Sequence, residues 1–176
     1  MKTGTKVLLS VAAVLVVALA AVGALMVFNK SPDLLDSDFK VIVTGSMDGE
    51  PHPEYDIETI PVNSLIAAHK LHGDEVYDVK VGDVIGFYSA RLNANIYHRV
   101  IEIDEENKVF TTKGDAATTT ESVHFEDANG VVVNVNHPAG EFISFVKKNI
   151  FFLVAIVVLI LIMSEAVIYF MKTWKE

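Results

Sequence analysis

Residues 39–47 read Phe39-Lys40-Val41-Ile42-Val43-Thr44-Gly45-Ser46-Met47. The β-branched run that ends at Val43 predicts a strand, and the Thr-Gly-Ser-Met that follows predicts a tight turn. Gly45 has no Cβ, so the backbone can turn sharply there and another segment can approach it closely. The turn would present the hydroxyl of Ser46 at the end of a stiff element. This arrangement suits either an ordinary strand end or a nucleophilic serine.

The composition divides the 176 residues into distinct parts. Two long apolar runs cover residues 7–28 and 150–171, and the segment 29–149 between them has ordinary composition. That middle segment holds 21 of the 23 acidic residues and 10 of the 14 basic ones. Its acidity argues against a nucleic-acid partner, since nucleic acids require a cluster of Lys and Arg. There is no cysteine, which excludes disulfides, thiolate zinc sites and thiol catalysis.

The two apolar runs predict membrane segments. Residues 7–28 carry no charge and are long enough to cross the ~30 Å hydrocarbon core as a helix. The alternative is a cleavable signal peptide, but the apolar run continues past its cleavage site at residues 18–20, which favours a retained anchor. Residues 150–171 predict a second span, although Ser164-Glu165 interrupts it. The alternative there is an apolar helix that lies on the membrane or docks to a partner subunit.

The basic residues at the two ends of the chain predict its orientation. Lys2 and Lys6 precede the first apolar run, and Lys172 and Lys175 follow the second. The positive-inside rule therefore predicts that residues 1–6 and 172–176 are cytoplasmic. The segment 29–149 would then lie on the outer face of the cell membrane, in a multi-pass protein.

The middle segment has short β-like patterns with turn signals between them. Strands are predicted at residues 64–71, 83–88, 96–103, 109–112 and 131–135. Three prolines predict an irregular loop at 48–61, and no stretch has a helical period long enough for a crossover helix. The predicted fold is mainly β: a compact antiparallel β-sheet catalytic domain flanked by an N-terminal and a C-terminal transmembrane helix.

His98 is the histidine whose pattern is most informative. In the strand predicted at 96–103, Ile96, His98 and Val100 share one face. Partial burial there disfavours the imidazolium and keeps a neutral base available. A serine hydroxyl is a poor nucleophile until a base takes its proton, so Ser46 and His98 indicate catalysis only together. The alternative is a half-buried core histidine.

Two carboxylates could complete such a pair. Asp115 closes Lys113-Gly114-Asp115, and Glu121 follows six residues later. Either could fix the tautomer of an imidazole and stabilise its cation. The alternatives are a turn residue and a surface charge. His69 and His72 have no third metal ligand at a recognisable spacing in the sequence. We therefore interpret them as surface histidines and not as a metal site.

The order of these motifs is more specific than any one of them. An apolar span is followed by Val-Thr-Gly-Ser-Met, Val-Lys-Val-Gly-Asp-Val-Ile, His-Arg-Val and Lys-Gly-Asp. This order resembles type I signal peptidases, within the endoplasmic-reticulum-type branch of archaea, eukaryotes and some bacteria. The resemblance covers the first span and about residues 39–121.

The resemblance implies roles for individual residues. Ser46 would be the nucleophile and His98 the general base, with the Thr44 hydroxyl and the Ser46 N–H holding the oxyanion. Asp115 matches the family's Gly-Asp acid, but Glu121 stands where the family usually has a second aspartate. The choice between these two acids stays open. A further departure is the Pro-rich insertion after Met47, which we interpret as a variable loop near the substrate groove.

The implied function is a membrane-bound serine endopeptidase, a signal peptidase I. It would cleave N-terminal signal peptides from exported preproteins by acyl transfer, without metal or cofactor. Its partners would be signal peptides, the lipid bilayer and the translocon or accessory subunits. One alternative is a catalytically silent, membrane-anchored β module that binds or scaffolds exported proteins. Another is a peptidase of the same fold dedicated to a few substrates.

Overall fold

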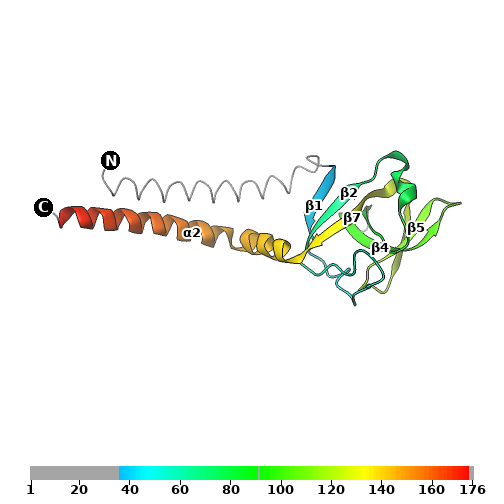
Figure 1. Ribbon diagram of the computed structural model, residues 1–176, viewed down its shortest axis with the longest axis horizontal. Coiled ribbons are helices and arrows are strands. Elements are labelled where there is room, and N and C mark those ends of the chain that lie inside the picture. The colour runs from blue at the N-terminus through cyan, green and yellow to red at the C-terminus, as the bar shows by residue number, and fades with distance from the viewer. Residues whose placement is uncertain (1–35, 91, 175–176) are drawn as a thin grey trace. The chain divides into compact units, whose positions relative to one another are not determined.

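The computed structural model describes residues 36–90 and 92–174 (Figure 1). The chain divides into two compact units, a β unit that ends at Ser144 and a helical unit from Phe145 onwards. The predicted first span at residues 7–28 and the N-terminal residues 1–6 lie outside the described residues.

The described residues of the β unit form a seven-stranded antiparallel sheet, which confirms the predicted antiparallel β domain. The strand order is β1-β2-β7-β3-β4-β5-β6. The strands are β1 (Ser37–Val41), β2 (Leu65–Lys70), β3 (Val84–Ser89), β4 (Ala94–Asp104), β5 (Val109–Lys113), β6 (Thr120–His124) and β7 (Ala128–Asn136). Two short 3-10 helices, η2 (Gly73–Asp78) and η3 (Phe125–Asp127), connect them.

The predicted strands agree with the structure apart from one omission. The five strands predicted between residues 64 and 135 correspond to β2, β3, β4, β5 and β7, and residues 48–61 contain neither helix nor strand. The strand predicted to run through Val43 ends at Val41. β6 lies outside the predicted strands, because Val123 is its single buried residue and its apolar signal is therefore weak.

The sheet carries apolar side chains on both faces. Neighbouring residues of a strand point to opposite sides, so Val84 and Ile85 of β3 belong to different clusters. One cluster contains Val79, Ile85, Phe87, Val100, Phe110, Val123, Phe125 and Ala128. The other contains Met47, Ile60, Ile66, Ala68, Val84, Tyr97 and Val132. His98 and Arg99, as neighbours on β4, therefore face opposite sides of the same sheet.

The C-terminal helix α2 (His137–Thr173) begins well before the predicted boundary at residue 150. The predicted segment 29–149 therefore contains the first turns of α2. A polar start explains the difference: the Asn136 side chain accepts a hydrogen bond from the Ala139 N–H at 2.9 Å, and Pro138 suits a first turn. The prediction followed the apolar run and missed this cap.

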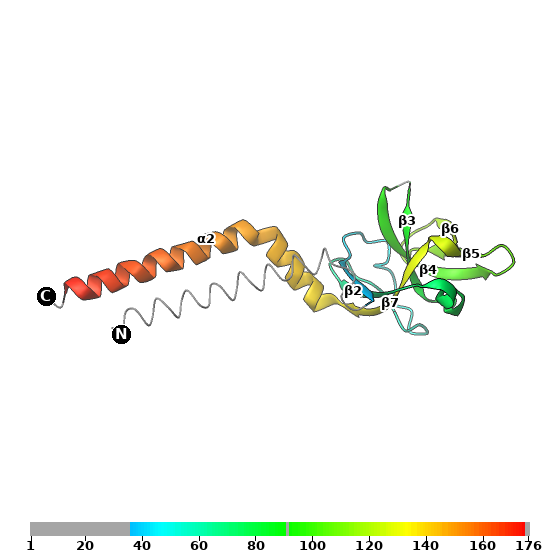
Figure 2. The same cartoon turned by 90° about the horizontal axis from the view of Figure 1, so that it is seen from above.

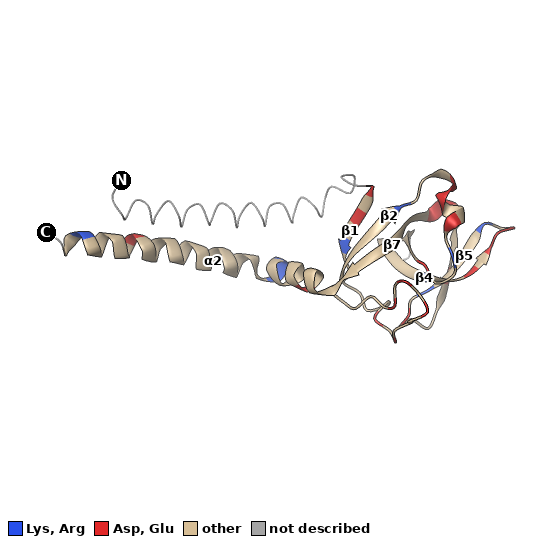
Figure 3. Ribbon diagram, in the orientation of Figure 1, with Lys and Arg blue, Asp and Glu red and all other residues tan. Residues whose placement is uncertain are grey.

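A kink separates the polar beginning of α2 from its apolar part (Figure 2). Asn149 has non-helical dihedral angles (φ −111°, ψ 15°), and its side chain donates to the Phe145 carbonyl at 2.8 Å. By length and composition α2 could cross a membrane. Glu165 is the single charged residue of 150–171, whereas charged residues are frequent along the β unit (Figure 3).

Candidate active site

Ser46 lies in a turn that follows the end of β1. Beyond Val41 the backbone stays paired, since the Ile42 N–H donates to the Ser64 carbonyl at 2.9 Å. The turn closes with a hydrogen bond from the Asp48 N–H to the Gly45 carbonyl at 3.1 Å. Met47, next to Ser46, is only 1% exposed and packs in the apolar core. A buried neighbour on a closed turn holds the half-buried Ser46 in place.

His98 lies in the middle of β4 and is 8% exposed. Its ring meets the ring of Phe87 edge to face, with centroids 6.1 Å apart. Phe87 and Val100 belong to one apolar cluster, with Ile96 packed against it. The predicted common face of Ile96, His98 and Val100 is thus confirmed, and this face holds the imidazole largely away from water.

Ser46 and His98 meet at Gly114, which follows the end of β5. A Cβ on residue 114 would lie 3.1 Å from His98 Nε2, 3.1 Å from Ser46 Cβ and 2.5 Å from the Ser46 carbonyl oxygen. The Ala116 N–H donates to that same carbonyl at 2.9 Å. The serine turn and the imidazole therefore share a space that is open only because residue 114 has no side chain.

Glu121 lies on the other side of the imidazole. Its Oε2 is 3.1 Å from His98 Nδ1, and both side chains are largely buried. Glu121 pairs with Thr112 across β5 and β6, and Thr112 pairs with Val100 across β4 and β5. The glutamate thus reaches across β5 to a histidine on β4.

Asp115 faces Arg99 instead of His98. Its carboxylate accepts two hydrogen bonds from the guanidinium, from Nε at 2.8 Å and from Nη2 at 2.6 Å. Both side chains are 3% exposed. The Arg99 Nη1 also donates to the Gly82 carbonyl at 2.8 Å. Two fixed hydrogen bonds of this kind are among the strongest that side chains form, so Asp115 is held beside the arginine.

Arg99 is the site residue whose role the sequence reasoning missed. The His-Arg-Val motif contained it, but its partner lies 16 residues away, in the turn after β5. A basic residue directly after a buried histidine on a strand points to the opposite face, where it needs a buried acid. That alternation, together with the nearby Lys-Gly-Asp, is the signal that could have indicated the pair.

Thr44 is exposed and lies two residues before Ser46 on the same segment. His69 and His72 lie beside carboxylates on the surface. His69 Nε2 is 3.5 Å from Glu75, and His72 Nε2 is 2.8 Å from Asp36. The hydrogen bond from His72 lowers the pKa of Asp36. Among the described residues, no group of three or more His, Cys, Asp and Glu side chains is arranged to hold a metal ion.

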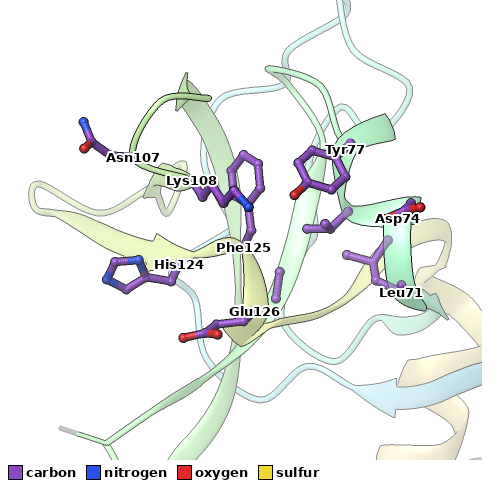
Figure 4. A pocket seen from close by; sticks show the side chains of 11 residues that line it. Leu71, Asp74, Tyr77, Asn107, Lys108, His124, Phe125 and Glu126 are labelled. Carbon is purple, nitrogen blue, oxygen red and sulfur yellow. The ribbon is translucent and has the colours of Figure 1, made fainter.

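A cavity of about 550 Å³ lies away from Ser46, beside the far ends of β5 and β6 (Figure 4). Tyr77 and Phe125 form its aromatic wall, with ring centroids 5.6 Å apart, and Lys108 Nζ lies 5.9 Å from the Tyr77 centroid. His124, at the far end of β6 from the Glu121 region, also lines it. The cavity is therefore separate from the place where Ser46 and His98 meet.

Comparison of the chain with protein-family models and with curated proteins gives no match. The function is therefore inferred from the motif order and from the geometry of this site.

Proposed function

We propose that this protein is a membrane-anchored serine endopeptidase that removes signal peptides from exported preproteins. One observation carries the proposal: Ser46 and His98 Nε2 converge on Gly114, while Glu121 lies 3.1 Å from the other imidazole nitrogen. A nucleophile, a base and a carboxylate behind the base are the parts that acyl transfer by serine requires.

In the proposed reaction, Ser46 Oγ attacks the scissile carbonyl carbon and its proton passes to His98 Nε2. The Ser46 N–H and the Thr44 hydroxyl would stabilise the oxyanion, each contributing about 3 kcal/mol to the transition state. His98 then returns the proton to the leaving amine as the peptide bond breaks. Water, deprotonated by His98, attacks the acyl-enzyme and restores the Ser46 hydroxyl.

The arrangement favours Glu121 over Asp115 as the acid that orients His98. Asp115 already accepts two hydrogen bonds from Arg99, whereas Glu121 lies against His98 Nδ1. A carboxylate there would hold the proton on Nδ1, so that Nε2 is the nitrogen that accepts the proton of Ser46. The extra methylene of glutamate, compared with aspartate, lets the side chain reach across β5.

The membrane context supports a substrate that is itself held in the membrane. A signal peptide has an apolar segment followed by small residues at its cleavage site. Confining an enzyme to the same bilayer raises its effective concentration towards such a substrate. In the proposed topology both termini are cytoplasmic and the β unit lies on the outer face. Translocon or accessory subunits would be its partners.

The test is cleavage of a radiolabelled preprotein by the full-length protein in detergent or liposomes. We expect processing by the wild type, loss of processing in Ser46→Ala and His98→Ala, and normal processing in a control variant, His124→Ala. His124 is exposed on β6, the same strand as Glu121. A covalent serine probe should label the wild type at Ser46 alone. Intact processing by Ser46→Ala would refute the proposal, and a folded wild type without processing or labelling would favour the silent β module.

A further inference from the structure

The Pro-rich insertion after Met47 is fastened to the backbone of the serine turn. The Ile60 N–H donates to the Met47 carbonyl at 3.0 Å. The Thr59 hydroxyl contacts the same carbonyl at 3.1 Å and the Gly49 carbonyl at 3.3 Å. These bonds bring the end of the insertion back to the residue next to Ser46. The insertion, interpreted from the sequence as a variable loop, is therefore held to the serine turn by specific hydrogen bonds.

The insertion also closes on itself and presents Tyr55. The His52 N–H donates to the Glu58 carbonyl at 2.9 Å, and the Tyr55 N–H donates to the His52 carbonyl at 3.1 Å. The rings of His52 and Tyr55 lie 5.8 Å apart. The closed loop therefore holds Tyr55 in one orientation.

Tyr55 covers the guanidinium of Arg99. The centre of its ring lies 5.0 Å from Arg99 Cζ, within the range of a cation–π contact. The ring also lies against Gly82, where a Cβ would overlap ring carbon Cδ1. Gly82 has a φ of 103°, a backbone conformation that favours glycine. The tyrosine ring can lie here because this backbone carries no side chain.

Arg99 also connects the insertion to the serine turn, through Asp115. Its Nη2 lies 3.4 Å from the Glu58 carbonyl of the insertion and 2.6 Å from Asp115. Asp115 stands between Gly114, which packs on Ser46, and Ala116, whose N–H donates to the Ser46 carbonyl at 2.9 Å. Gly49 also packs directly on Asp115. Any movement of Arg99 would thus be transmitted to both segments that hold Ser46.

We infer that Tyr55 is a positioning residue for Ser46, acting through Arg99 and Asp115. The ring excludes water from one face of the guanidinium and favours the orientation in which both its hydrogen bonds to Asp115 are made. This fixes the 114–116 turn and, through it, the serine. The effect on Ser46 reactivity rests on the proposed function, whereas the effect on the order of the turn does not.

The experiment compares Tyr55→Leu and Tyr55→Phe with the wild-type full-length protein in detergent. Leucine keeps apolar bulk but has no aromatic face, whereas phenylalanine keeps the face and loses only the hydroxyl. The matched control is Tyr77→Leu, because Tyr77 also lies beside a cation, Lys108, but at the distant cavity. The rate of covalent labelling by a fluorophosphonate is resolved into kinact and KI, and the thermal midpoint is measured for each variant.

We expect Tyr55→Leu to lower kinact about tenfold or more with little change in KI, since small displacements of a reacting group have large effects on rate. Tyr55→Phe and Tyr77→Leu should retain the wild-type kinact. Equal losses in Tyr55→Leu and Tyr55→Phe would overturn the inference, because the aromatic face would not be the cause. A wild-type kinact in Tyr55→Leu, or an equal loss in Tyr77→Leu, would overturn it as well.

Hydrogen exchange separates this inference from the proposed function. In Tyr55→Leu, the amides of Ala116 and Ile60 should exchange faster, whereas in Tyr55→Phe they should keep their protection. Unchanged exchange of both amides in Tyr55→Leu would refute the positioning role. If the wild type is not labelled at Ser46, the proposed function fails, and the exchange of these two amides still decides whether Tyr55 orders the turn. A Gly82→Ala variant, which displaces the same ring, should reproduce the faster exchange.

Discussion

His98 Nδ1 lies 3.1 Å from Glu121 Oε2, although two strand pairings separate the residues in the sheet. The contact crosses β5, so it depends on the length of the glutamate side chain and on the register of β4, β5 and β6. It assigns Glu121 to the histidine and leaves Asp115 to Arg99. The separate positions of the two acids lead to different expectations for their variants.

Glu121→Gln should abolish most of the proposed activity with little effect on folding. The amide keeps the shape of the side chain but stabilises neither the imidazolium nor the productive tautomer, so we expect kcat to fall by about 10³-fold or more. The kcat of Glu121→Asp should lie between those of the wild type and Glu121→Gln, because the shorter side chain retracts from His98 Nδ1. Preprotein cleavage assays would measure this, with Glu126→Gln, at an exposed site, as control. Wild-type kcat in Glu121→Gln would exclude this role.

Asp115→Asn and Arg99→Met should each destabilise the β unit. Removing one partner of a buried ion pair leaves the other charge uncompensated, which typically costs about 3–5 kcal/mol. The double variant Asp115→Asn with Arg99→Met should be less destabilised than the sum of the two single changes. Urea unfolding of the full-length protein in detergent, followed by circular dichroism, would measure these differences. Additive losses would show that the pair contributes no coupling energy.

Gly114→Ala should prevent covalent labelling of Ser46. The new methyl group would lie 2.5 Å from the Ser46 carbonyl oxygen and 3.1 Å from both Ser46 Cβ and His98 Nε2, so the serine turn must move away from the histidine. Gly73→Ala is the contrasting variant, because a Cβ there meets nothing within 4 Å, although its φ of 54° strains an alanine. It should keep labelling even if its thermal midpoint falls. Normal labelling of Gly114→Ala would contradict the geometry of the site.

The β unit should lose stability at alkaline pH through Tyr97 and Lys40. Burial raises the pKa of Tyr97. Burial lowers the pKa of Lys40, but the hydrogen bond with Asp38 and the charges of Asp38 and Tyr97 outweigh this effect and raise it. A pKa that is higher in the folded state means that folded protein binds more protons, so stability is complete below the unfolded pKa and falls as pH rises towards the folded one.

The measurement is the urea midpoint between pH 8 and about pH 11, which spans the ordinary pKa of tyrosine. Tyr97→Phe should show a shallower decline than the wild type, while Tyr88→Phe, on an exposed tyrosine, should follow the wild type. If the urea midpoint declines identically with pH in all three proteins, Tyr97 is not the cause of the lost stability.

The proposed topology can be tested with single cysteines, since the chain has none of its own. In intact cells, a membrane-impermeant maleimide should label Asn95→Cys, at an exposed position of the β unit. It should label Glu176→Cys only after the membrane is permeabilised. Labelling of Glu176→Cys in intact cells would place the C-terminus outside and exclude a cytoplasmic tail.

Local patterns predicted most of the β unit. Short β-like patterns with turn signals between them predicted β2, β3, β4, β5 and β7, because such signals depend only on neighbouring residues. The face shared by Ile96, His98 and Val100 followed from the same rule. The pattern failed at β6, whose single buried Val123 gives little periodicity, and at the start of α2, where a polar Asn136 cap precedes the apolar run.

By itself, the sequence determined the candidate serine and histidine, the antiparallel β class and the apolar segment after Asn149, because each depends on neighbours within a few residues. Only the tertiary structure decided which acid meets the histidine, since that depends on strand register. It also decided that Arg99 holds Asp115 and that Tyr55 covers Arg99. Such partners come from distant strands and loops, and their pairing is set by how the sheet brings them together.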